Sequence, residues 1–355
     1  MRSISTKKRF FEHGFKAGYL ESGKNNMISD VSGVKVGHLT KFDGADIRTG
    51  ITIVDPGVRE LFRKKLPAAI YVGNGYGKMT GTTQIEELGT LETPIALTNT
   101  LAVGPAMRGL VDLTIKNTQD LEPTESINAV VGETNDGLLN SLHKNVLSLK
   151  DVFAAYESRK EIFEIGNVGA GTGTRCFSWK GGIGTSSRKI KINGEVYTVG
   201  ALLQTNFGGS LSILGIPVGK FLGENDYRIE KDLPDGSCMM VIATDAPLSA
   251  RQLKRLAKRA PLGLARTGSI MANGSGDYAI AFSTSRAGIE NPENIFSCLA
   301  DSDLTNLFLA VTETVEESVY DALFAADTMI GRDGNKLEAF PKEKVLPFLT
   351  DLYAK

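Results

Sequence analysis

Short apolar runs bounded by glycine or polar residues recur along the chain and predict β-strands. They lie at residues 50–54, 68–72, 94–97, 129–131, 199–203 and 238–244. Over residues 189–199, polar and apolar positions alternate on both sides of Asn193-Gly194. Because Asn-Gly favours the two-residue turn that joins antiparallel strands, this segment is predicted to form a β-hairpin.

Two longer segments show the three- and four-residue spacing of apolar side chains that is typical of helices. Residues 249–260 predict an amphipathic helix with Ser249 as its N-cap, and residues 304–326 predict a longer helix. No internal repeat or long Pro/Ser-rich linker divides the sequence, so we expect one α/β domain over residues 1–355. The most polar connector, residues 223–236, is expected to be an exposed loop.

Composition excludes several classes of partner. The chain of 355 residues carries 40 Lys and Arg against 41 Asp and Glu, so its net charge gives no reason to expect nucleic acid or an anionic membrane. Apolar runs such as residues 239–243 are far shorter than the roughly 20 residues that span a bilayer. The N-terminus is basic but no apolar run follows it, so we expect no secretory signal and a cytoplasmic location.

Neither a metal nor a cofactor is expected. The three cysteines, Cys176, Cys238 and Cys298, are scattered, and the three histidines form no His-x-x-x-His pair. The glycine-rich segment 169–174 matches neither nucleotide-binding glycine motif, and no Gly-x-Ser-x-Gly sequence occurs. The sequence therefore favours chemistry that uses no imidazole.

The dipeptide Gly236-Ser237 ends the polar connector and begins a predicted buried strand. In isolation this pattern is typical of a simple turn. A second interpretation is chemical: a serine hydroxyl directly after glycine can attack the preceding carbonyl, since glycine has no Cβ to obstruct the approach. Hydrolysis of the resulting ester would free Ser237 as a new N-terminus, whose α-amine, with an ordinary pKa of about 7.7–8.0, can act as base for its own hydroxyl.

Several segments, in order, resemble the L-aminopeptidase D-amidase/D-esterase family, which includes the β-peptidyl aminopeptidases. They are residues 28–38, Gly73-Asn-Gly-Tyr-Gly77, Leu97-Thr-Asn-Thr100, Val131-Gly-Glu-Thr-Asn-Asp-Gly137, Val168-Gly-Ala-Gly-Thr-Gly173, Lys180-Gly-Gly-Ile-Gly-Thr185, Asp235-Gly-Ser237 and Asn273-Gly-Ser-Gly-Asp277. The resemblance implies a four-layer αββα sandwich, similar to N-terminal-nucleophile hydrolases but with its own strand connectivity. It also implies self-cleavage between Gly236 and Ser237 into an α fragment, 1–236, and a β fragment, 237–355. The residues through Asn26 lie outside it and receive no function.

The same resemblance implies the roles of the catalytic residues. Ser237 is the nucleophile, and Asn206 matches the family's oxyanion-hole asparagine. Ser275 and Asp277 match the serine and the acidic residue that support the nucleophile, although some members carry Glu where this chain has Asp277. Asn206 and Ser275 also have a structural interpretation, since Asn206 shortly precedes Gly208-Gly209 and Ser275 lies between Gly274 and Gly276, in sequences that are typical of turns.

The substrate implied is a short peptide, amide or ester with a free N-terminal amine. Glu133 matches the acidic residue that receives the substrate's ammonium group, and Asn135 is expected to face the same pocket. The segments around Asn99 and residues 73–77 are expected to shape the pocket wall or a subunit contact, and Cys238 to point into the core. Members form homo-oligomers, so a tetramer of processed units is expected.

Two other functions remain open at this point. An acyltransferase of the ornithine acetyltransferase type resembles this family in architecture, but such enzymes use a threonine nucleophile where this chain has Ser237. An uncleaved, non-catalytic binding protein of the same fold is the second alternative, and the presence of Gly236, Asn206 and Ser275 argues against it.

Overall fold

The computed structural model describes residues 8–223, 236–290 and 298–353, and its strands form two stacked sheets. The small sheet has the order β1-β2-β5-β6 and the large sheet the order β4-β3-β12-β11-β10-β9. The small sheet consists of β1 (Lys35–Asp43), β2 (Ile47–Asp55), β5 (Ile95–Asn99) and β6 (Val130–Thr134). The large sheet consists of β3 (Leu66–Gly75), β4 (Thr90–Leu91), β9 (Ile183–Ile192), β10 (Glu195–Asn206), β11 (Ser237–Thr244) and β12 (Gly276–Ser283).

Neighbouring strands are antiparallel except for two pairs, β5 with β6 and β11 with β12, which are parallel. Two short hairpins lie outside the main sheets. They are β7 (Arg175–Cys176) with β8 (Trp179–Lys180), and β13 (Met329–Ile330) with β14 (Lys336–Leu337).

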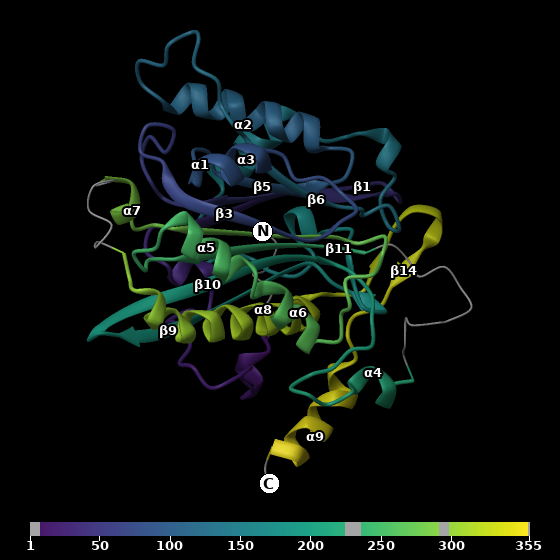
Figure 1. The fold of residues 1–355 in the computed structure, drawn as a ribbon. Coiled ribbons are helices and arrows are strands. Elements are labelled where there is room, and N and C mark those ends of the chain that lie inside the picture. Colours follow the sequence, from purple (N-terminus) through teal and green to yellow (C-terminus); the bar gives the residue numbers. More distant parts are fainter. Residues whose placement is uncertain (1–7, 224–235, 291–297, 354–355) are drawn as a thin grey trace.

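Helices cover the outer face of each sheet (Figure 1). Helices α2 (Val103–Asn117) and α3 (Leu149–Glu157) lie on the small sheet, and α5 (Ala250–Ala257), α6 (Ala260–Arg266) and α8 (Thr305–Ala325) lie on the large one. The shorter or peripheral helices are α1 (Thr82–Leu88), α4 (Val218–Phe221), α7 (Ala287–Glu290) and α9 (Lys342–Tyr353).

A hydrophobic core fills the space between the two sheets. Val54, Leu97 and Val130 come from the small sheet, and Ile70, Met239 and Ile280 come from the large sheet. Separate clusters join each sheet to its own helices. The layers are therefore helix, sheet, sheet and helix, which confirms the expected four-layer αββα sandwich. No helix in the described part of the chain is both long and apolar enough to cross a bilayer.

The predicted elements are confirmed, with shifts at their ends. Asn193 and Gly194 have φ of 52° and 92° and connect β9 to β10 as a tight turn. Ser249 caps α5 as expected. The predicted helix 249–260 is divided, because Pro261 occupies the first turn of α6, the part of a helix that tolerates a missing N–H. The expected exposed loop at 223–236, including Asp235, lies outside the described residues except for Gly223 and Gly236.

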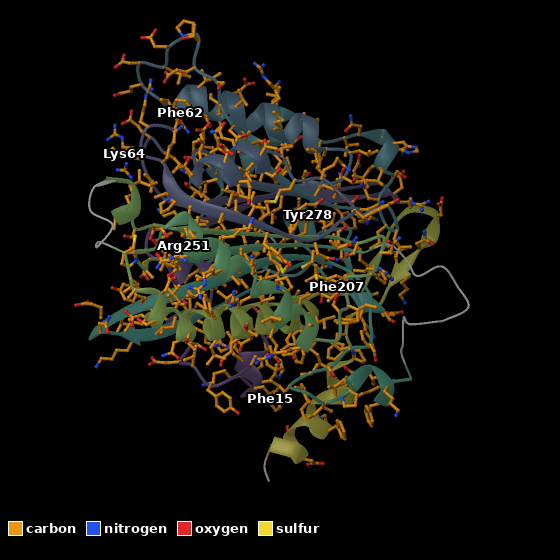
Figure 2. All side chains as sticks on the ribbon, viewed as in Figure 1. Phe15, Phe62, Lys64, Phe207, Arg251 and Tyr278 are labelled. Carbon is orange, nitrogen blue, oxygen red and sulfur yellow. The ribbon has the colours of Figure 1, made fainter. Side chains whose placement is uncertain are left out.

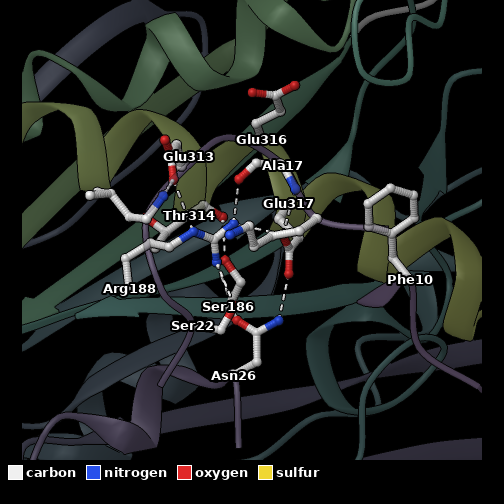
Figure 3. Close-up of polar contacts among 12 residues, drawn as sticks. Phe10, Ala17, Ser22, Asn26, Ser186, Arg188, Glu313, Thr314, Glu316 and Glu317 are labelled. Carbon is white, nitrogen blue, oxygen red and sulfur yellow. Dashed lines mark hydrogen bonds and ion pairs between the residues drawn. The ribbon is translucent and has the colours of Figure 1, made fainter. Parts of the chain in front are cut away.

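The segment before β1 is held against α8 by buried carboxylates (Figure 3). Glu313 and Glu317 accept hydrogen bonds from backbone N–H groups of Ala17, Tyr19 and Leu20, and Asp321 accepts one from Phe10. The guanidinium of Arg188 on β9 pairs with both glutamates, at 3.1 Å for Glu313 and 2.6 Å for Glu317. Residues 8–26, which the sequence left without a role, therefore form part of the packed structure.

Candidate active site

One end of the large sheet brings residues of four neighbouring strands into register. Asn206 at the end of β10 lies opposite Ser237, the first residue of β11, and Ser237 lies beside Gly276, the first residue of β12. Gly75 of β3 completes the row. Phe207 and Tyr278, which follow Asn206 and Asp277 in the chain, are labelled in Figure 2. Strand pairing thus brings Asn206 and Gly276 beside Ser237, from which they are 31 and 39 positions away in the sequence.

The hydroxyl of Ser237 lies beside the carbonyl of the residue that precedes it. Its Oγ donates to the Gly236 oxygen at 2.5 Å, and the side chain is buried. The Gly276 N–H donates to the same carbonyl oxygen at 3.2 Å and lies 3.3 Å from Ser237 Oγ. A Cβ at Gly236 would lie only 3.1 Å from Phe207 Cα. The geometry therefore gives the hydroxyl close access to a carbonyl that a backbone N–H polarises.

The side-chain amide of Asn206 is fixed in one orientation. Its Oδ1 accepts from the Arg175 N–H at 3.2 Å, and its Nδ2 donates to the Asn135 carbonyl at 3.0 Å. Since Nδ2 carries two hydrogens, one remains for another acceptor. Asn206 lies opposite Ser237 in the sheet, so its side-chain amide belongs to the same end of the sheet as the Ser237 hydroxyl.

The loop that carries the Asn135 carbonyl is anchored by a buried carboxyl group. Asp136 accepts from Asn140 Nδ2 at 2.9 Å, and its backbone oxygen accepts from the N–H groups of Leu139 and Asn140. Burial raises the pKa of Asp136 to about 7. This residue lies within a motif that the sequence had singled out, but only the fold shows that its turn supports Asn206.

Ser275 and Asp277 are buried near Ser237 without hydrogen bonds of standard geometry among the described residues. Asp277 lies opposite Cys238 in the parallel pair of β11 and β12. Burial raises the pKa of Asp277 to about 6, while the Ser275 hydroxyl and the Cys238 N–H lie near enough to favour its charged form. Two predicted supporting residues are therefore close together and keep free acceptor and donor capacity.

The turn before β12 is held in place by Asn74, which the sequence analysis did not single out. Asn74 Nδ2 donates to the carbonyl oxygens of Ala272, Asn273 and Ser275. Gly73, which precedes Asn74 in β3, is the extra residue of a β-bulge. The bulge shifts the register of β3 against β12 between Asp277 and Tyr278. The glycine-rich segment 73–77 gave the only sequence signal for this position.

A cavity of about 320 Å³ opens in front of Ser237 and contains the predicted substrate-binding residues. Glu133, at the edge of the small sheet, is 3% exposed, and its Oε1 accepts from the Lys78 N–H at 2.9 Å. Asn135 also lines the cavity, but its Oδ1 accepts from the Gly137 N–H. The segment Gly75–Gly77 forms part of the wall, as expected.

Two further expectations concern residues outside the cavity. Asn99 bonds to the N–H groups of Leu101 and Ala102 and to Thr49, so its role is architectural. Cys238 is fully buried in the core between the large sheet and its helices, where burial raises the pKa of its thiol well above the ordinary value. Among the described residues, no group of three or more His, Cys, Asp or Glu side chains could hold a metal ion.

Comparison with known proteins identifies the family. The model of peptidase family S58 matches residues 26–337. The β-peptidyl aminopeptidase BapA of Sphingosinicella microcystinivorans is 37% identical, over 92% of this chain and 88% of its own length.

Two solved structures have the same fold over nearly the whole chain. The PH0078 protein of Pyrococcus horikoshii OT3 is 43% identical, with a TM-score of 0.89, covering 98% of this chain and 100% of that one. The L-aminopeptidase D-Ala-esterase/amidase of Ochrobactrum anthropi, described as a new variant of the Ntn hydrolase fold, is 32% identical with a TM-score of 0.86, covering 98% and 99%. Since the family model, the sequence relative and the folds agree over most of its length, this chain belongs to peptidase family S58.

Proposed function

We propose that the chain cuts itself between Gly236 and Ser237 and then acts as a serine aminopeptidase on short peptides, amides or esters. The observation that carries this proposal is the row formed by Asn206, Ser237 and Gly276, with Ser237 Oγ 2.5 Å from the Gly236 oxygen. Membership of a peptidase family and the names of its relatives, a β-peptidyl aminopeptidase and an L-aminopeptidase, support the same function.

Self-cleavage takes two steps, an acyl shift from nitrogen to oxygen and hydrolysis of the resulting ester. Ser237 Oγ attacks the Gly236 carbonyl carbon and its proton passes to the Ser237 nitrogen, so the C–N bond breaks and an ester to Oγ forms. The Gly276 N–H, 3.2 Å from the carbonyl oxygen, stabilises the negative charge on that oxygen. Water then hydrolyses the ester, which leaves a carboxylate on Gly236 and a free α-amine and hydroxyl on Ser237. The products are the fragments 1–236 and 237–355.

Peptide cleavage then uses the same atoms with the new amine as base. Ser237 Oγ attacks the substrate carbonyl, its proton passes to the Ser237 α-amine, and the free hydrogen of Asn206 Nδ2 stabilises the oxyanion. The leaving amine takes the proton, and water releases the acyl group from Oγ. Asp277, supported by Ser275, orients the amine and stabilises its ammonium form.

Glu133 provides the selectivity for a free N-terminus. Its carboxylate is buried at the cavity that Ser237 also lines, so an ammonium group on the substrate can pair with it while the first carbonyl reaches Oγ. Asn135 contributes to the same wall. An internal peptide bond offers no such charge, which makes the site suited to release of N-terminal residues.

We also place the enzyme in the cytoplasm as a homo-oligomer, a tetramer of processed units. All three cysteines are free, as is usual in reducing compartments. Large apolar side chains are exposed on and beside β3, including Val72, Tyr76 and Leu88, and could be covered by a second copy. Light scattering on the purified protein tests the assembly directly.

The intact mass under denaturing conditions tests the proposed processing. We expect two species of about 25 and 13 kDa, in proportion to the residue counts, from a chain of 38.1 kDa, with the smaller beginning at Ser237. The Ser237→Ala variant should remain one species and should release no product from N-terminal amides. A wild-type chain that stays intact and inactive would support an uncleaved binding protein instead.

A further inference from the structure

Lys78 occupies the position that the proposed function assigns to the substrate's ammonium group. Its Nζ lies 3.1 Å from Glu133 Oε1 and donates to Thr100 Oγ1 at 2.7 Å. Its backbone N–H donates to the same Glu133 oxygen. The lysine side chain is half-exposed whereas Glu133 is almost fully buried. The chain therefore carries its own ammonium group on the carboxylate that selects the substrate.

Charge balance shows what happens when a substrate enters. Among the described residues that line the cavity in the uncleaved chain, Lys78 and Glu133 are the charged side chains, and their charges cancel. A substrate with a neutral first residue adds a second ammonium beside one carboxylate, which leaves an excess positive charge in a partly enclosed site. A substrate that also carries a carboxylate beside its amine restores the neutrality of the site. Its carboxylate also gives Lys78 a new partner in place of Glu133, which the substrate's ammonium occupies.

We propose that Lys78 is a specificity-determining residue that favours first residues with a free carboxylate on the carbon that carries the amine, as in β-aspartyl peptides. The inference rests on the proposed function, because it assumes that Glu133 receives the substrate's ammonium. Glu133 and Lys78 are adjacent ions, so a substrate ammonium and carboxylate on one carbon can contact both at once. Such a residue exchanges one internal ion pair for two ion pairs with the substrate.

Hydrolysis of β-aspartyl and β-alanyl p-nitroanilides by the processed enzyme tests this assignment. The wild type should have the higher kcat/KM on the β-aspartyl substrate. The Lys78→Met variant should lose about tenfold on β-aspartyl, the size expected for a charge-assisted hydrogen bond. It should gain about 2- to 5-fold on β-alanyl, because the half-exposed Lys78 ammonium no longer competes for Glu133. Lys78→Arg should keep the acidic preference.

A loss of kcat/KM on the β-aspartyl substrate together with a gain on the β-alanyl substrate would separate a role in specificity from a structural role. Lys64→Met, an exposed lysine outside the cavity, is the matched control and should leave both rates unchanged. Equal losses on both substrates in Lys78→Met, or an unchanged ratio, would overturn the proposal. If the wild type hydrolysed neither these two substrates nor any other N-terminal amide, the proposed function would fail separately. Thermal shifts with aspartate and β-alanine would then decide the Lys78 inference, which requires aspartate to stabilise the wild type more than Lys78→Met.

Discussion

Two groups of buried polar side chains lie on the large sheet, and they differ in how completely they are paired. At β9, Arg188 is fully buried, and its guanidinium is surrounded by Glu313, Glu317 and backbone carbonyl oxygens. At the start of β12, Ser275 and Asp277 are equally buried, but their side-chain oxygens make no hydrogen bond of standard geometry among the described residues.

The difference distinguishes a polar cluster that stabilises the fold from one whose groups remain available for the proposed reaction. Removing a buried group from water is unfavourable unless hydrogen bonds compensate, so a fully paired network can stabilise the fold. Groups left without partners have donors and acceptors available for a reaction, and their pKa values shift, as that of Asp277 does. In this protein the paired cluster joins the N-terminal segment to α8, and the unpaired cluster lies beside Ser237.

The largest expected effect is the loss of Arg188. Arg188→Met leaves two buried glutamates without their cation, so the free energy of unfolding should fall by about 3–5 kcal/mol. Arg251→Met removes an exposed ion pair with Asp301 and should cost less than about 1 kcal/mol. Urea denaturation of both variants measures the contrast. Similar losses in the two variants would show that full pairing at Arg188 contributes little.

A smaller effect, on kcat rather than stability, is expected at Asn206. Asn206→Ala removes the amide that Arg175 and Asn135 hold beside Ser237, and kcat should fall about 10²–10³-fold, or about 2.7–4 kcal/mol. Because this variant can also slow self-cleavage, the rate must be referred to the processed fraction measured by mass. A kcat within threefold of the wild type, per processed chain, would exclude Asn206 from the oxyanion site.

The smallest effect is a pH dependence set by Asp277. A carboxyl group whose pKa rises on folding binds its proton more tightly in the folded chain, so stability is lost as the pH rises from about 4 to about 6. At about 1.36 kcal/mol per pKa unit, the loss is about 3 kcal/mol at most. In the uncleaved Ser237→Ala background, Asp277→Asn should remove this contribution and leave the loss due to Asp136, whose pKa burial raises to about 7. Denaturant titration from pH 4 to 7 of both chains measures the difference.

Two comparisons sharpen the test at Asp277. The exposed Asp333→Asn should leave the pH dependence unchanged. In the cleaved wild type, the Ser237 ammonium should lower the pKa of Asp277 and weaken the dependence. A pH profile that is the same with and without Asp277 would contradict the assignment of the raised pKa to this residue.

The sequence alone predicted the main elements and suggested Gly236-Ser237 as a reacting dipeptide. Apolar patterning identified strands such as residues 199–203 and the helix 304–326, because burial of one face imposes a period on the chain. Gly236-Ser237 could be interpreted chemically because the reactivity of a serine after glycine depends on two neighbouring residues. Ordered motifs also pointed to Asn206, Ser275, Asp277 and Glu133 through the family resemblance.

Only the tertiary structure decided how these residues meet. Strand register places Asn206 and Gly276 beside Ser237, and register depends on pairing between segments far apart in sequence. The roles of Asn74 and Lys78 likewise come from contacts with residues 201 and 55 positions away. Local patterns cannot encode such contacts, because they arise when two sheets pack and bring their strand ends to one cavity. The hydrogen bonds that distinguish Arg188 from Asp277 follow from the same packing.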